Sequence, residues 1–198
     1  MTGPRARKIR VAILISGAGS NMAALIDAAA RSDAAYEVAL VLSNKPDAGG
    51  LAVAAAKGVP ALAVDHRPFE RDREAHEQVV HAALEAHGVQ AVALAGYMRL
   101  LTPWLVQRWA GRMLNIHPSL LPLYPGLDTH ARALAAGDAE AGCTVHIVTE
   151  GVDEGPILDQ ARVPIVTGDT PAGLAQRVLE AEHRLFPRAL SAWARSLD

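Results

Sequence analysis

Short apolar runs rich in β-branched residues alternate with longer alanine-rich segments along the first two thirds of the chain. The runs have the length of strands, and the longer segments carry the apolar spacing of helices. This alternation predicts an α/β fold: an open, mostly parallel, twisted sheet with helices on both faces. The expected strands are residues 11–15, 37–42, 61–64, 89–94 and 112–116, and the expected helices are residues 21–30, 50–57, 71–87, 103–109 and 129–135.

The pattern changes after Gly142. Two strand-like runs, residues 143–148 and 158–165, are separated only by the loop 149–156. Such a loop is too short for a crossover helix, so we expect this pair of strands to be antiparallel. A last helix, expected from about residue 170 to Pro187, closes the fold.

Length and composition favour one domain over residues 1–198, with residues 1–9 as a flexible N-terminal extension. A net charge of −2 and a pI near 6.4 give no electrostatic reason to expect nucleic acid or an anionic membrane as a partner. The apolar run after the basic N-terminus is too short for a signal peptide. The single cysteine, Cys143, cannot form an internal disulfide, which fits a reducing compartment. We therefore expect a cytoplasmic protein that acts on small molecules.

Asn115 and His117 stand at the end of an apolar run, two residues apart, which places both side chains on one face of a strand. An amide donor beside an imidazole suits a reaction in which a carbonyl oxygen gains negative charge while a proton moves. Pro118 ends the strand, so both groups belong to the edge of the sheet where ligands bind in α/β folds. The alternative for each residue alone is a turn former or a buried structural group.

The segment 16–21 follows the first expected strand and opens the first expected helix. Backbone N–H groups and the helix dipole form an anion site at such a junction, and Gly17 and Gly19 allow close approach. The segment is not the dinucleotide fingerprint, because Met22 occupies the third glycine position. The second strand is followed by residues 43–45, Ser-Asn-Lys, and not by an acidic residue. A monophosphate fits better; a plain strand-to-helix turn is the alternative.

The acidic loop 149–156 follows the strand that carries His146. A carboxylate from this loop, with Asp153 as the candidate, would orient His117 and favour its charged form. The alternative is a solvated acidic turn, with His146 as a structural histidine. The eight histidines show no ligand-like spacing, so we expect no metal site.

With these motifs in order, the chain closely resembles the phosphoribosylglycinamide formyltransferases, from about Arg10 to Leu190. The segments that carry the resemblance are residues 15–21, 43–45, 94–99, 114–122, 124–127 and 152–156. The resemblance implies a Rossmann-like fold. It also implies transfer of a formyl group from the co-substrate 10-formyltetrahydrofolate to the amine of glycinamide ribonucleotide in de novo purine biosynthesis, without a metal.

Residue roles follow from the same resemblance. Asn115, His117 and Asp153 form the catalytic group. Gly19, Ser20, Asn21 and Glu182 bind the ribonucleotide. The folate site is lined by Arg73, Met98, Arg99, Leu100, Leu101, Asn115, Thr149, Glu150, Gly151, Val152 and Asp153.

Three alternative functions remain open at this point. The chain could be a formyltetrahydrofolate hydrolase, another formyl-folate transferase such as one that acts on methionyl-tRNA, or a non-catalytic nucleotide-binding module. A transferase that acts on tRNA would need an additional basic domain, for which this chain has neither the length nor the charge. The protein is expected to be a monomer or a homodimer.

Overall fold

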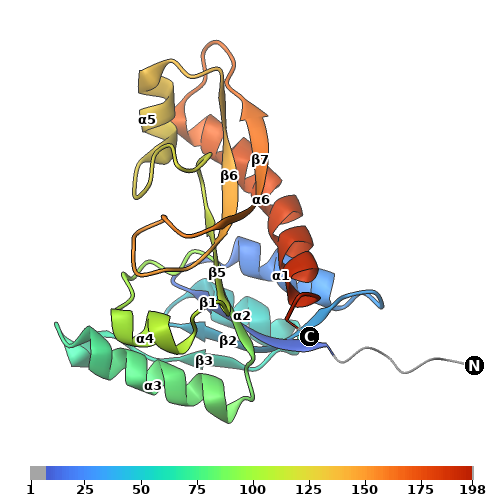
Figure 1. Ribbon diagram of the computed structural model, residues 1–198, viewed down its shortest axis with the longest axis vertical. Coiled ribbons are helices and arrows are strands. Elements are labelled where there is room, and N and C mark those ends of the chain that lie inside the picture. Colours follow the sequence, from blue (N-terminus) through green and yellow to red (C-terminus); the bar gives the residue numbers. More distant parts are fainter. Residues whose placement is uncertain (1–7, 198) are drawn as a thin grey trace, which may run out of the picture.

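The computed structural model describes residues 8–197, and seven strands in that part of the chain form one sheet (Figure 1). The strand order is β3-β2-β1-β4-β5-β6-β7. Strands β1 to β5 are parallel, whereas β6 is antiparallel to both β5 and β7. This confirms the predicted parallel sheet with an antiparallel pair near the C-terminus. The strands are β1 Ile9–Ile15, β2 Tyr36–Ser43, β3 Ala61–Ala63, β4 Ala91–Leu94, β5 Met113–His117, β6 Glu140–Ile147 and β7 Ile157–Pro164.

Polar side chains cap the N-termini of two helices, α3 and α6. The Asp72 side chain accepts a hydrogen bond from the N–H of Ala75 at the start of α3, and Thr170 does the same for Gly173 at the start of α6. The helices are α1 Ser20–Ala29, α2 Gly49–Ala56, the 3-10 turn η1 Arg67–Phe69, α3 Arg73–Ala86, α4 Pro103–Arg108, α5 Thr129–Ala136 and α6 Pro171–Ala194.

Most boundaries differ by one to three residues from the sequence-based expectations, and three of the differences are informative. Helix α3 begins at Arg73 and not at residue 71, because Asp72 is its N-cap. Helix α6 continues through Pro187 to Ala194. Burial of Leu190 and Trp193 offsets the cost of an internal proline. Strand β1 begins at Ile9, inside the expected N-terminal extension, whose residues 1–7 lie outside the described part of the chain.

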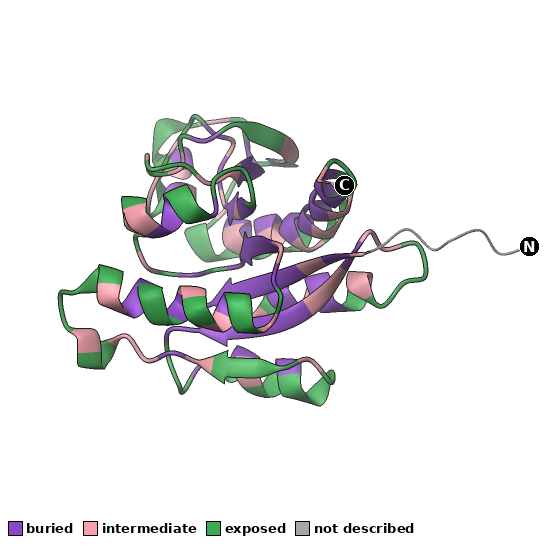
Figure 2. Ribbon diagram, turned by 60° about the horizontal axis from the view of Figure 1, so that its bottom comes forward, coloured by how far each residue is buried: buried purple, intermediate pink, exposed green. Residues whose placement is uncertain are grey.

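The core has two layers, one on each face of the sheet. Along β1, Val11 and Ile13 contribute to the layer that includes residues of α1, α2, α5 and α6. Ala12 and Leu14 point to the opposite layer, which includes residues of α3 and α4. The central strands are therefore buried on both faces, as Figure 2 shows. This double burial explains why their sequence is continuously apolar.

The carboxyl ends of the central strands set the position of the site. Leu14 of β1 is level with Leu94, the last residue of β4, and Leu94 is level with Asn115 of β5. Strand β5 continues to His117, which pairs with Thr144 of β6. Asn115 consequently lies level with the end of β4, and His117 extends past it, into the region to which the loops after the parallel strands return.

Candidate active site

Asp153 lies between the two polar residues of β5. One carboxylate oxygen, Oδ2, is 3.3 Å from Nδ1 of His117 and accepts a hydrogen bond of 2.9 Å from the N–H of Gly126. The other oxygen, Oδ1, accepts from Nδ2 of Asn115 at 3.4 Å. Asp153 has a positive φ of 57°, a conformation that aspartate tolerates better than most residues. The acidic loop thus brings its carboxylate to His117, as the sequence predicted.

Hydrogen bonding identifies the form of His117 that fits this geometry. Its Nε2 atom lies 2.9 Å from the carbonyl oxygen of Tyr124, which can only accept a proton. Its Nδ1 atom faces the Asp153 carboxylate, which is also an acceptor. An imidazolium offers an N–H to each of these acceptors. The surroundings of His117 therefore match its protonated form.

The pKa of Asp153 is lowered from its usual value of 3.8. Burial alone would raise this pKa, but a hydrogen bond from His146 and one from the N–H of Gly126 outweigh burial. The charges on His117 and His146 act in the same direction. Asp153 is therefore a carboxylate at neutral pH.

His146 orients the amide of Asn115. Nδ1 of His146 lies 3.0 Å from the carbonyl oxygen of Ile147, so this nitrogen carries a proton. The remaining nitrogen, Nε2, lies 3.2 Å from Nδ2 of Asn115 and 3.6 Å from Oδ1 of Asp153. Without a proton Nε2 accepts from Asn115, and with a proton it donates to Asp153. The amide nitrogen of Asn115 consequently points to His146 and Asp153. A histidine that the sequence left open as structural thus belongs to the site.

The segment 16–21 has the form of an anion site. Gly19 has a φ of 74° and precedes the first residue of α1. A Cβ atom at Gly19 would lie 3.0 Å from Cε of Met22 and 3.2 Å from Cα of Gly50, so a side chain is excluded by contact and by conformation. Ser20 is exposed at the N-terminus of the helix, where the dipole favours an anion.

Glu182 of α6 reaches the same segment. Its Oε2 atom accepts a hydrogen bond of 2.7 Å from Nδ2 of Asn21, and both side chains are buried. Burial raises the pKa of Glu182, and the hydrogen bond from Asn21 opposes this only in part. Oδ1 of Asn21 has no hydrogen-bond partner among residues 8–197. A free acceptor and a carboxylate thus lie at the start of α1.

Apart from Arg73 of α3 and Asn115 of β5, the residues expected at the folate site lie on two segments, one before α4 and one in the acidic loop. In the segment after β4, the side chains of Met98 and Leu100 are 65% and 62% exposed. Arg73 donates a hydrogen bond of 3.3 Å to the carbonyl of Leu100, so the structure brings these two residues together. Exposed apolar side chains beside polar backbone groups suit the binding of a flat, partly polar ring system such as that of a folate.

The second segment is the acidic loop. Glu150 accepts a hydrogen bond of 2.9 Å from Gln107 of α4, and Val152 is exposed. The loop also includes Thr149 and Gly151. Because α4 follows the first segment along the chain, the bond to Gln107 connects the acidic loop to the helix that the first segment leads into.

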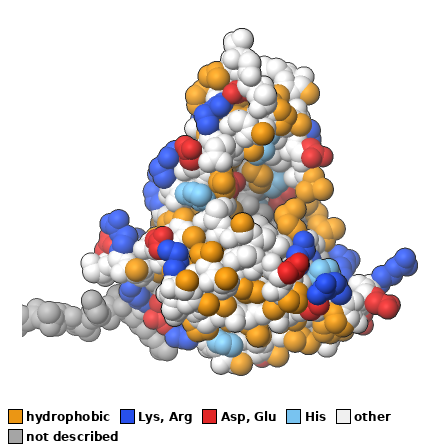
Figure 3. Space-filling model, turned by 180° about the vertical axis from the view of Figure 1, so that it is seen from behind, with side chains coloured by type: hydrophobic (Ala, Val, Ile, Leu, Met, Phe, Trp, Pro, Cys, Tyr) orange, Lys and Arg blue, Asp and Glu red, His pale blue; other side chains and the backbone are white. Residues whose placement is uncertain are grey.

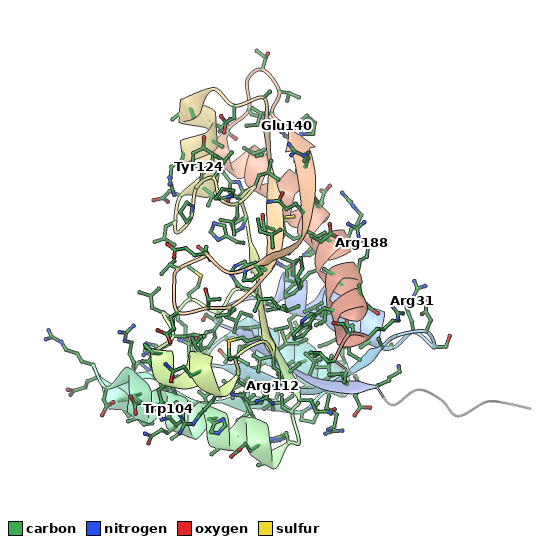
Figure 4. All side chains as sticks on the ribbon, viewed as in Figure 1. Arg31, Trp104, Arg112, Tyr124, Glu140 and Arg188 are labelled. Carbon is green, nitrogen blue, oxygen red and sulfur yellow. The ribbon has the colours of Figure 1, made fainter. Side chains whose placement is uncertain are left out.

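Sequence reasoning missed two backbone groups. The carbonyl of Tyr124 contacts His117, and the N–H of Gly126 contacts Asp153. Figure 4 shows Tyr124 beside α5, at the other end of the view from Trp104 on α4. Every residue has these groups, so a side-chain pattern could not reveal them. The only indication in the sequence was that residues 124–127 contribute to the family resemblance, and that resemblance assigned them no role in the site.

Three features of the described residues bear on the alternative functions. On the face in Figure 3, basic and acidic side chains are interspersed. Within residues 8–197, no helix is long and apolar enough to cross a membrane. In the same part of the chain, no group of three or more His, Cys, Asp or Glu residues could hold a metal ion.

Comparisons with known proteins agree with this geometry. The formyl transferase family model matches residues 9–190. The trifunctional purine biosynthetic protein adenosine-3 of Drosophila melanogaster is 50% identical over 93% of this chain, which spans only 14% of that protein. The phosphoribosylglycinamide formyltransferase of Escherichia coli (strain K12) is 42% identical, with 94% of this chain and 87% of the relative covered. The crystal structure of phosphoribosylglycinamide formyltransferase from Brucella melitensis superimposes with a TM-score of 0.91 at 54% identity, covering 95% of this chain and 96% of the other.

Proposed function

This chain belongs to the formyl transferase family, and we propose that it transfers a formyl group from 10-formyltetrahydrofolate to the amine of glycinamide ribonucleotide. The products are formylglycinamide ribonucleotide and tetrahydrofolate, and the reaction is a step of de novo purine biosynthesis. The observation that carries the proposal is the group at the end of β5, where Asp153 contacts both His117 and Asn115.

Asn115, His117 and Asp153 are the catalytic residues of this proposal. The ribonucleotide amine attacks the formyl carbon and forms a C–N bond, and the carbonyl oxygen becomes an oxyanion. The amide of Asn115 and the imidazolium of His117 are the donors that stabilise it, and each exchanges one of its acceptors within the protein for the oxyanion. The intermediate then breaks the bond to the folate nitrogen, which gains a proton as the attacking nitrogen loses one. Asp153 keeps His117 oriented and charged, and no covalent enzyme intermediate is needed.

The ribonucleotide phosphate binds at the start of α1. Gly19, Ser20 and Asn21 offer backbone and side-chain donors there, and the buried Glu182 contacts the same substrate. Binding energy at the phosphate, remote from the reacting amine, serves to align the two substrates. Alignment of this kind can supply about 7–11 kcal/mol of the barrier reduction.

The folate occupies the region between the segment after β4 and the acidic loop. The segment after β4, with Met98, Arg99, Leu100 and Leu101, lies on one side. The acidic loop with residues 149–153 lies on the other. Arg73 supports the first segment through Leu100 and remains available to a folate carboxylate, because its side chain lies at the surface.

We also propose that the chain works as one catalytic domain in the cytoplasm, as a monomer or a homodimer. All seven strands between residues 8 and 197 belong to one sheet, which supports a single domain. The low net charge supports small-molecule substrates without nucleic acid or membrane partners.

The test is the spectrophotometric rate of deformylation of 10-formyltetrahydrofolate by the purified protein, with and without glycinamide ribonucleotide. We expect turnover that requires the ribonucleotide and yields the formylated product. Loss of formyl groups without the ribonucleotide would identify a hydrolase, and no turnover in either condition would favour a non-catalytic binding module. The His117→Ala variant is the control for a contaminating activity.

A further inference from the structure

One buried serine joins the two segments that the proposed function assigns to different substrates. Ser16 directly precedes the phosphate segment, 17–21, and its N–H donates a hydrogen bond of 3.1 Å to the carbonyl of Gly96. Its hydroxyl accepts a hydrogen bond of 2.8 Å from the N–H of Met98. The start of the phosphate segment is thus held directly against the folate segment, 97–101.

Asn44 fixes the direction of the Ser16 hydroxyl. The hydroxyl donates its only proton to Oδ1 of Asn44, at 2.5 Å, which leaves its oxygen free to accept from Met98. Ser16 and Asn44 are 6% and 1% exposed, so water does not compete for these bonds. His66 donates in turn from Nδ1 to the carbonyl of Asn44, at 2.8 Å. Residues after β1, β2, β3 and β4 therefore form one hydrogen-bonded chain.

The far ends of both segments are anchored as well. Arg73 donates to the carbonyl of Leu100, and the carboxylate of Glu77 accepts a hydrogen bond of 2.8 Å from the N–H of Thr102. At the far end of the phosphate segment, Nδ2 of Asn21 donates to Oε2 of Glu182 at 2.7 Å. Because both segments are fixed at their other ends, a shift of one segment is transmitted through Ser16 and is not absorbed elsewhere.

We propose that Ser16, oriented by Asn44, is a positioning residue that couples the two substrate sites. Ordering of the phosphate segment by the ribonucleotide orders the folate segment through the Met98 hydrogen bond, and the reverse also holds. The second ligand then loses less conformational freedom on binding than the first. Such coupling is reciprocal by thermodynamic linkage. The inference rests on the proposed function, because that function assigns the ligands of the two segments. The proposal also gives a role to the motif of residues 43–45, because Asn44 orients Ser16.

The test is calorimetric binding of glycinamide ribonucleotide with and without saturating tetrahydrofolate, a pair that cannot react. For the wild type we expect the ribonucleotide affinity to rise about 5-fold or more when tetrahydrofolate is bound. Ser16→Ala should bring the ratio of the ribonucleotide affinities with and without tetrahydrofolate close to one, while each ligand alone still binds. Ser16→Thr keeps the hydroxyl and should restore most of the ratio. Ser196→Ala, which removes a hydroxyl bound to the carbonyl of Trp193 at the end of the chain, should leave the ratio unchanged.

Hydrogen exchange tests the same inference in the unaltered protein. The ribonucleotide alone should slow exchange of the Met98 amide, although the phosphate segment and not Met98 is its binding site. This measurement decides the matter if Ser16→Ala does not fold. Independent binding of both ligands to the wild type, or an undiminished ratio in folded Ser16→Ala, would overturn the inference and leave the proposed function intact. Failure of the wild type to bind the ribonucleotide would overturn both.

Discussion

The carboxylate of Asp153 lies 3.3 Å from Nδ1 of His117, although one residue ends a strand and the other belongs to a loop beyond the next strand. The same carboxylate accepts from the backbone of Gly126. A charged aspartate and a histidine with a proton on each nitrogen satisfy all of these contacts together.

Asp153→Asn tests this pair. The amide side chain is neutral and has only one acceptor oxygen, so it cannot accept both from His117 and Gly126 and from Asn115. We therefore expect turnover to fall about 10²- to 10⁴-fold. Ribonucleotide affinity should change little, because the contacts of Asp153 are with His117, His146, Asn115 and Gly126 and not with the phosphate segment. Steady-state kinetics and calorimetric binding measure the two effects. Wild-type turnover in a folded Asp153→Asn protein would remove the proposed role.

The lowered pKa of Asp153 predicts how its contribution to stability depends on pH. Because the pKa is lower in the folded state, this contribution is present above the unfolded value of 3.8 and is lost as pH falls through the folded value. The difference in unfolding free energy between wild type and Asp153→Asn should therefore be constant from pH 7 down to about 4 and shrink only below that. Urea denaturation at a series of pH values measures it. A difference that declines already between pH 7 and 5 would contradict a lowered pKa.

Gly19→Val should weaken ribonucleotide binding strongly. A valine at this position clashes with Met22 and Gly50 and cannot easily adopt the positive φ, so the backbone must move away from the anion site. We expect at least about a 10-fold loss of affinity, equivalent to one strong hydrogen bond to a charged group. Gly111→Val is the matched control, because Gly111 also has a positive φ but open space around a Cβ atom. Equal ribonucleotide affinity in both folded variants would argue against the site.

Glu182→Gln should stabilise the protein while weakening substrate binding. Burial raises the pKa of Glu182 above its usual 4.5, so its ionisation favours the unfolded chain, and stability declines as pH rises through the folded pKa. Glutamine keeps an acceptor for Asn21 without the charge. We expect a higher Tm at pH 7 and about a 10- to 100-fold loss of ribonucleotide affinity. Glu180→Gln, on an exposed position of the same helix, should change neither property. An unchanged Tm for Glu182→Gln would show that the buried charge carries no cost.

Trp193→Ala tests the part of α6 that lies beyond Pro187. The Trp193 side chain is buried in the core layer that contains α6, so its removal should lower the unfolding free energy by about 3 kcal/mol. Gln176→Ala, on an exposed position of the same helix, should change it little. Urea denaturation distinguishes the two. A small effect of Trp193→Ala would mean that the helix end contributes little to the fold.

Much of the fold was predictable because the deciding signals are local. The alternation of apolar runs with helical segments indicates parallel strands, and the short loop between β6 and β7 permits only an antiparallel pair. The placement of Asn115 and His117 on one face also follows from backbone geometry within one strand. The end of α6 was not predictable in this way. A proline normally ends a helix, and only the packing of Leu190 and Trp193 against the core offsets it.

The sequence by itself therefore determined the type of sheet, the position of the phosphate segment and the pair at the end of β5, because each depends on neighbours along the chain. The tertiary structure decided which groups meet these residues. It brought Asp153 and His146 to Asn115, Glu182 to Asn21 and the carbonyl of Tyr124 to His117. These contacts join residues far apart in the sequence. They depend on how β6 and α6 pack against the parallel strands, which no local pattern specifies.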